Sequence, residues 1–392
     1  MIEGDPRFDR QALGRALQEA PAAEPPAAPR RRRRRLPVID WSSTGHPNLA
    51  PKVEETPRPK NYDPLPPADV VVMTWTAAEW EALDYVFSDQ RSREENPRPG
   101  PWRDKWHPWR RDFYTVYPDL WSRRLISAFQ RTAVGTPALN RSAQRWGSYM
   151  LVRIGSKRVL LFKSDLHLNQ DGERLPVASM VRRCVLETGA SLVLSAGTAG
   201  GVEEAQVLGD AMVTNAARFR LDQEFGNAAF NTVTHASSYA PPDTMVEAAS
   251  TLLMRVPEFE MVGPTAHFPE GTRLVPDDRQ PTIKIDPRPI LTTDFFEFGT
   301  THNRLGEEGC TCEMGDAVIG REIDRLNEER DGPDVGYAFV RNVSDPVING
   351  DLPLALQTAW AVVTYQLQGL ETSYNGAIAT WALIAADAEE AG

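Results

Sequence analysis

Short β-branched runs alternate with helical patterns along most of this chain, and this alternation restricts the possible folds more than any other feature. Residues 70–73 (VVVM) predict a strand, and residues 77–87 (AAEWEALDYVF) carry apolar side chains at helical spacing. Further strands are predicted at 149–154, 158–162, 191–196, 211–215, 290–293 and 337–343, and further helices at 176–188, 316–326, 352–367 and 372–386. This order predicts an α/β fold, a three-layer sandwich whose central sheet is mostly parallel or mixed.

Charge and cysteine usage narrow the class of protein. The chain has 392 residues and a net charge of −11, which argues against nucleic acid as its main partner. Its three cysteines, Cys184, Cys310 and Cys312, form no disulfide framework, and the last two are too close in sequence for a usual zinc pair. We therefore predict reduced, buried thiols, as in cytoplasmic proteins.

The sequence also carries no membrane or export signal. No apolar run approaches the roughly 20 residues of a membrane-spanning helix. The N-terminal residues lack the continuous apolar segment of a signal peptide. We expect a cytoplasmic protein without membrane contact.

Two segments stand apart from the alternation. Residues 1–68 hold 13 of the 32 prolines and a run of six arginines at 30–35. Such a segment buries too little apolar surface to offset the entropy of ordering it, which predicts a flexible arm before a domain at 69–392. Within that domain, residues 88–148 are rich in Arg and Pro and contain five of the ten tryptophans, which indicates an insertion rather than core.

Residues at the ends of the predicted strands are candidates for a functional site, because open α/β sheets bind ligands beyond the carboxyl ends of their strands. The strand at 191–196 runs into the glycine-rich stretch SAGTAGG. Glycines weaken a strand, so their presence indicates that something approaches its backbone closely. Other strand ends are followed by Glu79, by the segment 294–296 (DFF) and by the segment 344–346 (SDP).

Five segments in this order carry a resemblance to a known family. They are SAGTAGGV (195–202), LGDAMVTNAARF (208–219), TTDFFEFGT (292–300), CEMGDAVIG (312–320) and RNVSDP (341–346). In these residues, and over 69–388 apart from the insertion, the chain resembles the nucleoside phosphorylase and nucleosidase superfamily. That superfamily includes purine nucleoside phosphorylases, AMP nucleosidase and methylthioadenosine/S-adenosylhomocysteine nucleosidase. The resemblance implies their fold and an enzyme that cleaves the N-glycosidic bond of a purine nucleoside or nucleotide.

The resemblance implies roles for residues that contact the base. Asp345, which follows Ser344, falls on the family's general acid, the group that protonates the departing purine. A carboxyl group suits that task near neutral pH when a water-poor pocket raises its pKa. Phe296 falls on the aromatic residue that stacks on the base.

The resemblance also places the glycine stretch beside the sugar and the nucleophile. The residues of this stretch that fall on the binding positions are Thr198, Ala199 and Gly200. Thr198 offers a hydroxyl group, and the glycines are expected to make room for a sugar or an anion.

The nucleophile decides between a hydrolase and a phosphorylase. Related phosphorylases hold phosphate with an arginine three residues before the Ser/Thr of the glycine stretch, and Ser195 occupies that position here. Without a guanidinium, a charge-assisted clamp for phosphate is missing. Glu79 falls on the glutamate with which the nucleosidases hold a water molecule, so hydrolysis is favoured. Arg218, on a neighbouring strand, keeps a phosphate-dependent phosphorylase open as the alternative.

One position departs from the family's pattern. The family's ribose-binding glutamate follows a methionine, but Gly315 follows Met314 here. Either Glu313 or Asp316 is then expected to reach the ribose hydroxyls, or the ribose is held differently. This departure also keeps open a non-catalytic module that senses a nucleoside or nucleotide.

The insertion bears on the substrate. Its segment 101–111 (PWRDKWHPWRR) interleaves aromatic and cationic side chains, which suits either base stacking with phosphate contact or an oligomer interface. The first alternative implies a nucleotide, and the superfamily includes AMP nucleosidases and antiphage-defence effectors that cleave ATP-type nucleotides. We therefore expect adenosine-type nucleosides, AMP or ATP as substrate, no metal or cofactor, and a homo-oligomer, as is common in the family.

Overall fold

The computed structural model describes residues 36–57, 59–60, 63–88, 106–110, 145–164, 166, 177–222, 225–256 and 279–390. The arginine run at 30–35 and most of the insertion at 88–148 lie outside these ranges, so the expectations placed on them remain predictions. Within the described ranges, no helix combines the length and the apolar character required to cross a membrane.

Strands and helices alternate along the described chain. The strands are β1 (Lys52–Val53), β2 (Val70–Thr74), β3 (His107–Arg110), β4 (Arg145–Ile154), β5 (Lys157–Ser164), β6 (Leu192–Gly201), β7 (Ala211–Thr214), β8 (Ala216–Phe219), β9 (Thr234–Ala236), β10 (Ile283–Ile285), β11 (Ile290–Thr292), β12 (Thr311–Glu313) and β13 (Gly336–Asp345). The α-helices are α2 (Ala77–Phe87), α5 (Val177–Thr188), α6 (Val246–Ser250), α7 (Leu305–Glu308), α8 (Asp316–Glu329) and α9 (Leu354–Glu390). Two 3-10 helices, η2 (Trp41–Thr44) and η3 (Pro47–Leu49), precede β1.

The strands form one mixed sheet with β6 at its centre. The main path runs β1-β4-β5-β2-β6-β12-β11-β8-β9, while β13, β7 and β10 branch from β6 and β3 pairs with β4. β6 pairs in parallel with β2 and β13, and in antiparallel with β12 near its end. The α/β fold with a mixed central sheet is thereby confirmed.

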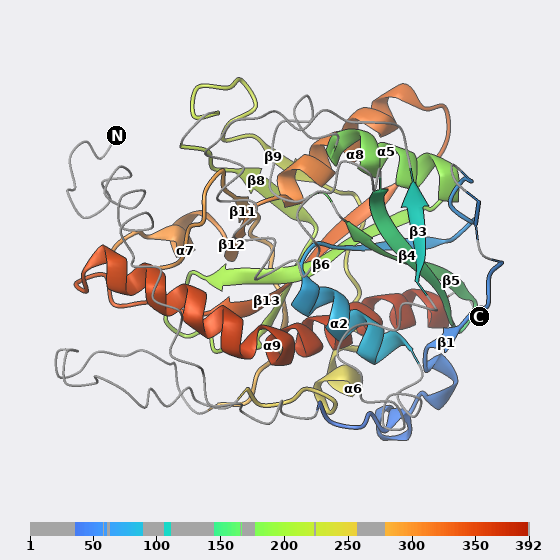
Figure 1. Cartoon of the computed structure of the whole chain (residues 1–392), viewed down its shortest axis with the longest axis horizontal. Helices are drawn as coiled ribbons and strands as arrows, with labels where there is room; N and C mark the ends of the chain where they lie inside the picture. Colours follow the sequence, from blue (N-terminus) through green and yellow to red (C-terminus); the bar gives the residue numbers. More distant parts are fainter. Residues whose placement is uncertain are drawn as a thin grey trace.

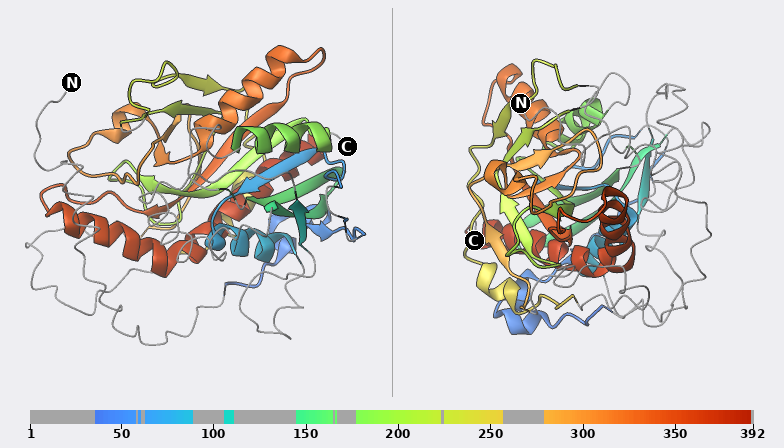
Figure 2. Two further views of the ribbon diagram at one scale, coloured as in Figure 1. Left: turned by 45° about the horizontal axis from the view of Figure 1, so that its top comes forward. Right: turned by 90° about the vertical axis from the view of Figure 1, so that its left-hand side faces the viewer.

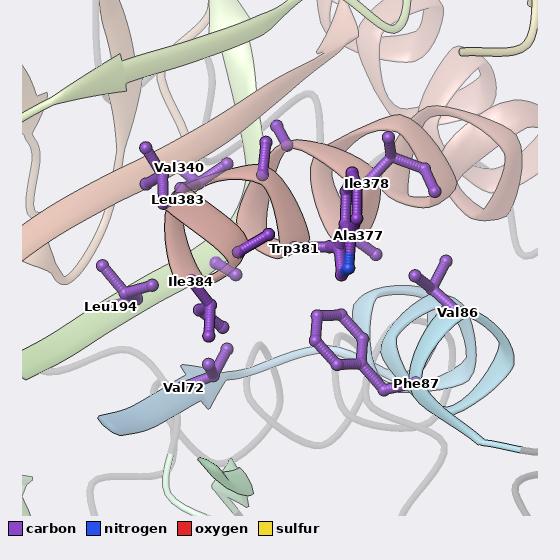
Figure 3. Close-up of a cluster of buried hydrophobic side chains, with 14 of the residues drawn as sticks. Val72, Val86, Phe87, Leu194, Val340, Ala377, Ile378, Trp381, Leu383 and Ile384 are labelled. Atoms are coloured by element: carbon purple, nitrogen blue, oxygen red, sulfur yellow. The ribbon is translucent and has the colours of Figure 1, made fainter. Parts of the chain in front are cut away.

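Two hydrophobic clusters, one on each face of the sheet, hold three layers together. α2, α6 and α9 cover one face, and α5 and α8 cover the other (Figures 1 and 2). In the first cluster, α9 lies across three neighbouring strands and beside α2 (Figure 3); the side chains labelled there include Trp381, Leu383, Ile384, Val72, Leu194, Val340 and Phe87. Each such side chain contributes about 1.5–3 kcal/mol by leaving water.

Part of the segment predicted as a flexible arm belongs to this core. Leu49 is buried, and Nε1 of Trp381 donates a hydrogen bond to its carbonyl oxygen at 2.9 Å. Ile39 lies in the same cluster, and β1 extends the sheet beside β4. The prediction of flexibility is therefore wrong for the described residues from Leu36 onward. A few well-placed apolar side chains anchor this segment although its overall composition is rich in proline.

The two ends of the insertion also pack into the domain. Nε1 of Trp106 donates to Asp84 of α2 at 2.9 Å. Trp109 of β3 is buried, and its ring lies 5.6 Å from the ring of Trp146 in β4. These three tryptophans fill the protein's own core, so they are not free to stack on a base or to cover an oligomer interface. The strand predicted at 149–154 accordingly begins earlier, at Arg145.

The two C-terminal helices predicted at 352–367 and 372–386 are a single helix, α9. Gly369 sits inside it, where glycine costs about 1 kcal/mol relative to alanine. A Cβ atom there would lie 3.2 Å from the Tyr365 ring and 3.6 Å from Ala78 of α2. Gly369 thus permits close packing between α9 and α2, and tertiary contacts outweigh the local preference for a break.

Candidate active site

The glycine stretch continues β6 past the end of β2. β6 pairs with β2 up to Ser195 but with β13 as far as Gly200, so the glycines are strand residues rather than a turn. A Cβ atom on Gly197 would lie 2.1 Å from Nη1 of Arg341 and 2.9 Å from Oε1 of Glu79. The protein's own side chains therefore already account for the close approach at Gly197, which the sequence had assigned to a sugar or an anion.

Glu79 occupies the space that opens where β2 ends. It is 4% exposed and lies in the first turn of α2, where it forms a capping box with Thr76. Its carboxylate accepts five hydrogen bonds of 2.8–3.0 Å, from Thr74 Oγ1, Trp75 N, Thr76 N, Thr198 N and Thr198 Oγ1. Burial by itself raises the pKa of Glu79, but the Arg341 charge and the backbone donors outweigh burial and lower it. Glu79 is therefore ionised at neutral pH.

Arg341 of β13 is the functional side chain that the sequence reasoning missed. It is 2% exposed; its Nε donates to Asp316 at 2.7 Å, its Nη2 also binds Asp316, and Nη2 donates to Oγ of Ser195 at 2.9 Å. Glu313 lies 3.4 Å from Nη2. An arginine within the buried strand at 337–343 was the available signal, because a buried charge requires partners.

Asp316 and Glu313 surround this guanidinium instead of facing an open space. Asp316 has no exposed surface, and Arg341 engages both of its oxygens. Glu313 accepts from the Asp316 backbone N–H at 2.8 Å; burial and then the Asp316 charge raise the pKa of Glu313 to about 7. By contrast, a Cβ atom on Gly315 would meet only Glu313 Oε2, at 3.7 Å. The missing glutamate thus leaves open space next to two carboxyl groups that are already engaged.

Asp345 lies on the other side of the glycine stretch. A register shift in β13 between Val343 and Asp345 brings Asp345 opposite Gly200, and such irregularities re-aim side chains. Ser344 donates to Oδ1 at 2.9 Å, while Oδ2 is buried without a hydrogen-bond partner among the described residues. Burial raises the pKa of Asp345 to about 7, and the Ser344 hydrogen bond only partly offsets this.

The segment around Phe296, which was predicted to stack on the base, lies beside Gly200 and Asp345. A Cβ atom on Gly200 would lie 3.1 Å from Oδ2 of Asp345 and 3.5 Å from Cα of Phe298. The Phe296 ring, which is half-buried, lies 6.1 Å from the Phe298 ring. Residues 296–298 are therefore neighbours of the buried acid.

Most, but not all, of the predicted site residues come together around β6. Those that do are Glu79, Thr198, Ala199, Gly200, Phe296, Glu313, Met314, Asp316, Ser344 and Asp345. Arg218 does not: its register partner is Leu291 of β11, which pairs with Cys312 of β12, and Cys312 pairs with Gly200. Three strand spacings separate Arg218 from β6, roughly 14 Å.

The remaining predicted features concern thiols and metals. Cys184, Cys310 and Cys312 are buried and form no disulfide, as predicted, and burial holds the pKa of Cys312 well above its usual value. Within the described part of the chain, no three His, Cys, Asp or Glu side chains gather so that they could hold a metal ion.

No protein-family model and no curated protein matches this sequence. Solved structures with a similar chain course include the 5'-methylthioadenosine/S-adenosylhomocysteine nucleosidase of Neisseria meningitidis in complex with methylthio-immucillin-A. It is 16% identical over 81% of this chain and 99% of that chain, with a TM-score of 0.42. Futalosine hydrolase of Helicobacter pylori is 11% identical over 80% of this chain and 96% of that chain, with a TM-score of 0.41.

A third similar structure is a putative 5'-methylthioadenosine/S-adenosylhomocysteine nucleosidase of Borrelia burgdorferi bound to adenine. It is 12% identical over 80% of this chain and 98% of that chain, with a TM-score of 0.44. Because the identities and scores are low, we infer the function from the side chains of the site.

Proposed function

We propose that this chain is an N-glycosyl hydrolase that cleaves the bond between base and sugar in a purine nucleoside or nucleotide. The observation that carries this proposal is the contrast between two buried carboxyl groups beside β6. Asp345 has an oxygen without a described partner and a pKa raised to about 7. Glu79 accepts five hydrogen bonds and is ionised. One group is equipped to give a proton, and the other to hold a nucleophile.

Asp345 would supply the proton to the leaving base. As a glycosidic bond breaks, the sugar gains oxocarbenium character and the leaving group gains negative charge. Protonation of the base relieves that charge, and an acid is most effective when its pKa lies near the working pH. Phe296, on the segment beside Gly200, offers an aromatic face against which the base can stack.

The charge around Arg341 favours water over phosphate as the nucleophile. Three carboxyl groups, those of Glu79, Glu313 and Asp316, surround this single guanidinium. A phosphate dianion would meet an excess of like charge there, which disfavours its binding. Water is neutral and needs only an acceptor and a donor. We therefore place hydrolysis ahead of phosphorolysis.

Glu79 would orient this water after exchanging one of its present partners. A carboxylate offers about four lone-pair positions, and five donors already occupy them. The Thr198 hydroxyl, at 2.8 Å from Oε1, can turn away by rotation about its Cα–Cβ bond. A water molecule would then take its place between Glu79 and the anomeric carbon, with Nη1 of Arg341 beside it.

We further propose that the substrate is an adenine nucleoside or one of its 5'-phosphates, AMP or ATP. The arginine run at 30–35 and the basic segment at 101–111 supply cations that suit phosphate contacts. Cleavage of ATP-type nucleotides is also the chemistry of the antiphage-defence effectors in the superfamily that the sequence resembles. A role in defence is the corresponding biological proposal.

Release of free base tests the proposed function. Purified protein is incubated with adenosine, methylthioadenosine, AMP and ATP, each with and without inorganic phosphate, and adenine is measured by chromatography. We expect adenine to appear without phosphate, at a rate that added phosphate does not raise. A requirement for phosphate would identify a phosphorylase instead. Ligand binding without any base release would identify a non-catalytic module, the alternative that Gly315 favours.

A further inference from the structure

Among the buried polar groups without a partner in the described structure are two on the elements that carry or flank the site. One is Oδ2 of Asp345, and the other is the hydroxyl group of Tyr365 in α9. A buried hydroxyl without a hydrogen bond costs about 1–3 kcal/mol, so such groups are rare unless a ligand or water completes them. The proposed donation of a proton to the base already accounts for the missing partner of the Asp345 oxygen. The Tyr365 hydroxyl has no role in the chemistry described so far.

Packing fixes Tyr365 beside the helix that carries Glu79. A Cβ atom on Gly369, one turn further along α9, would touch both the Tyr365 ring, at 3.2 Å, and Ala78 of α2, at 3.6 Å. Ala78 directly precedes Glu79 in the first turn of α2. The absence of a side chain at Gly369 therefore lets the Tyr365 ring lie against the start of α2.

The electrostatics agree with this location. Burial raises the pKa of Tyr365 well above its usual value, and the negative charges of Glu79 and Asp345 raise it further. The hydroxyl of Thr76, the residue that caps α2, is near enough to lower the pKa, although it forms no hydrogen bond of normal geometry with Tyr365. The phenol thus packs beside the helix that carries Glu79 and lies within electrostatic reach of both carboxyl groups that the proposed reaction uses.

The geometry of glycosidic hydrolysis indicates which part of the substrate lies between the Asp345 and Glu79 carboxyl groups. The base leaves from one face of the anomeric carbon, and the water attacks from the opposite face. Asp345 acts on the base and Glu79 on the water, so the sugar ring must lie between them. A hydroxyl group near both carboxyl groups therefore borders the sugar.

We infer that the Tyr365 hydroxyl binds a hydroxyl group of the substrate's ribose and so helps to select ribonucleosides. This inference rests on the proposed function. The Tyr365 hydroxyl would also give the sugar a polar contact that other residues do not provide. Gly315 contributes no side chain there, and Arg341 engages both oxygens of Asp316.

The test combines a single-atom change with matched changes in the substrate. Tyr365→Phe removes only the hydroxyl, and Tyr374→Phe is the control on the same helix, where the hydroxyl donates to the Leu252 carbonyl at 3.1 Å. For wild type and both variants, kcat/KM is measured with adenosine and with its 2'-deoxy, 3'-deoxy and 5'-deoxy analogues. Thermal unfolding of each protein is recorded as well.

We expect Tyr365→Phe to lower kcat/KM on adenosine about tenfold, the value of one neutral hydrogen bond. We also expect no further loss on the one deoxy analogue that lacks the contacted hydroxyl, whereas wild type and Tyr374→Phe discriminate against that analogue. Tyr365→Phe should unfold no earlier than wild type, because it loses no hydrogen bond within the described protein.

An equal loss on all four substrates, or no loss on any, would overturn the inference while the hydrolase stands. Failure of the wild-type protein to release base from these four substrates and from AMP and ATP as well would instead overturn the proposed function itself. The two failures are therefore distinguishable from one set of measurements.

Discussion

The two sides of β6 hold the same chemical group in opposite environments. Glu79 and Asp345 are both carboxyl side chains with only 4% of their surface exposed. Glu79 receives five hydrogen bonds and lies near the Arg341 guanidinium, whereas Asp345 receives one hydrogen bond, from Ser344. The pKa of Glu79 is consequently lowered, and burial raises that of Asp345 to about 7.

This difference teaches that a nearby cation and hydrogen-bond donors, rather than burial alone, set the protonation of a carboxyl group. Burial is the largest single influence on both residues and acts in the same direction on each. Only the number of N–H and O–H groups and the nearby cation distinguish them. Pairs of carboxyl groups driven apart in this way divide acid and nucleophile-holding tasks between them.

The largest expected effect comes from Asp345→Asn, which keeps the shape of the side chain and removes its proton. We expect base release to fall by roughly 10²- to 10⁴-fold, the usual contribution of a general acid. Thermal unfolding should change little, because an amide also suits a buried site with a single donor nearby. Unchanged turnover in this variant would remove Asp345 from the mechanism.

Arg341→Met tests the environment of Glu79 through the free energy of unfolding. Without the guanidinium, the carboxylates of Asp316 and Glu79 are left buried and uncompensated, which typically costs about 3–5 kcal/mol. Arg304→Met is the control, since the Arg304–Glu307 pair is exposed and such pairs contribute less than about 1 kcal/mol. Chemical denaturation measures both. Equal losses of stability in the two variants would mean that the buried Arg341 cluster stabilises the fold no more than an exposed ion pair does.

Glu79→Gln sharpens the comparison, because it repeats the carboxyl-to-amide change in the donor-rich environment. The new NH₂ group would face the N–H groups of Thr198 or of Trp75 and Thr76. We expect a loss of about 1–3 kcal/mol in the free energy of unfolding, for a buried donor left unpaired. Stability equal to that of Asp345→Asn would contradict the claim that the two sites differ.

The pH dependence should show the smallest but most diagnostic effect. Asp345 has to be protonated to act, so activity is expected to fall about tenfold for each pH unit above its pKa of about 7. Because its folded pKa is raised from 3.8, Asp345 also makes the folded state lose stability as pH rises from about 4 to about 7. Glu79, whose pKa is lowered, contributes in the opposite sense: its stabilisation is present above pH 4.5 and is lost as pH falls further.

Asp345→Asn is the control for this profile. Glu313 and Glu297 also have pKa values raised to about 7, so a residual pH dependence of stability is expected in the variant. A denaturation series across pH compares the two proteins. The same pH dependence in both would show that Asp345 is ionised in the folded state.

The sequence predicted the strands and helices that carry a clear local pattern of apolar residues. Buried runs such as 70–73 and 191–196, and the amphipathic pattern at 316–326, lie in β2, β6 and α8. The short strands β8, β9, β10 and β12 were missed, because three or four residues carry little periodicity, whereas β7 and β11, of similar length, were predicted. Long-range packing also decided the segment from Leu36 and the unbroken course of α9 across Gly369.

The site was predictable where a short motif carries it and was missed where tertiary contacts do. Thr198 and Asp345 belong to segments that resemble the superfamily, Glu79 falls on the position of the nucleosidase glutamate, and the structure brings the three residues together around β6. Arg341 and Tyr365 are defined by neighbours far apart in the chain, such as Asp316 and Ala78. Arg218 was selected from its position on a nearby strand, but register places it three strands away.

The most direct test of the account is to observe the protonation of Asp345 itself. Infrared difference spectra between the wild-type protein and Asp345→Asn, recorded from about pH 5 to about pH 9, isolate the carbonyl stretch of a protonated carboxyl group at this position. We expect that signal at the lower pH values, with loss at a midpoint of about 7. Its absence throughout would mean that Asp345 is a carboxylate like Glu79, and the division of labour across β6 would be wrong.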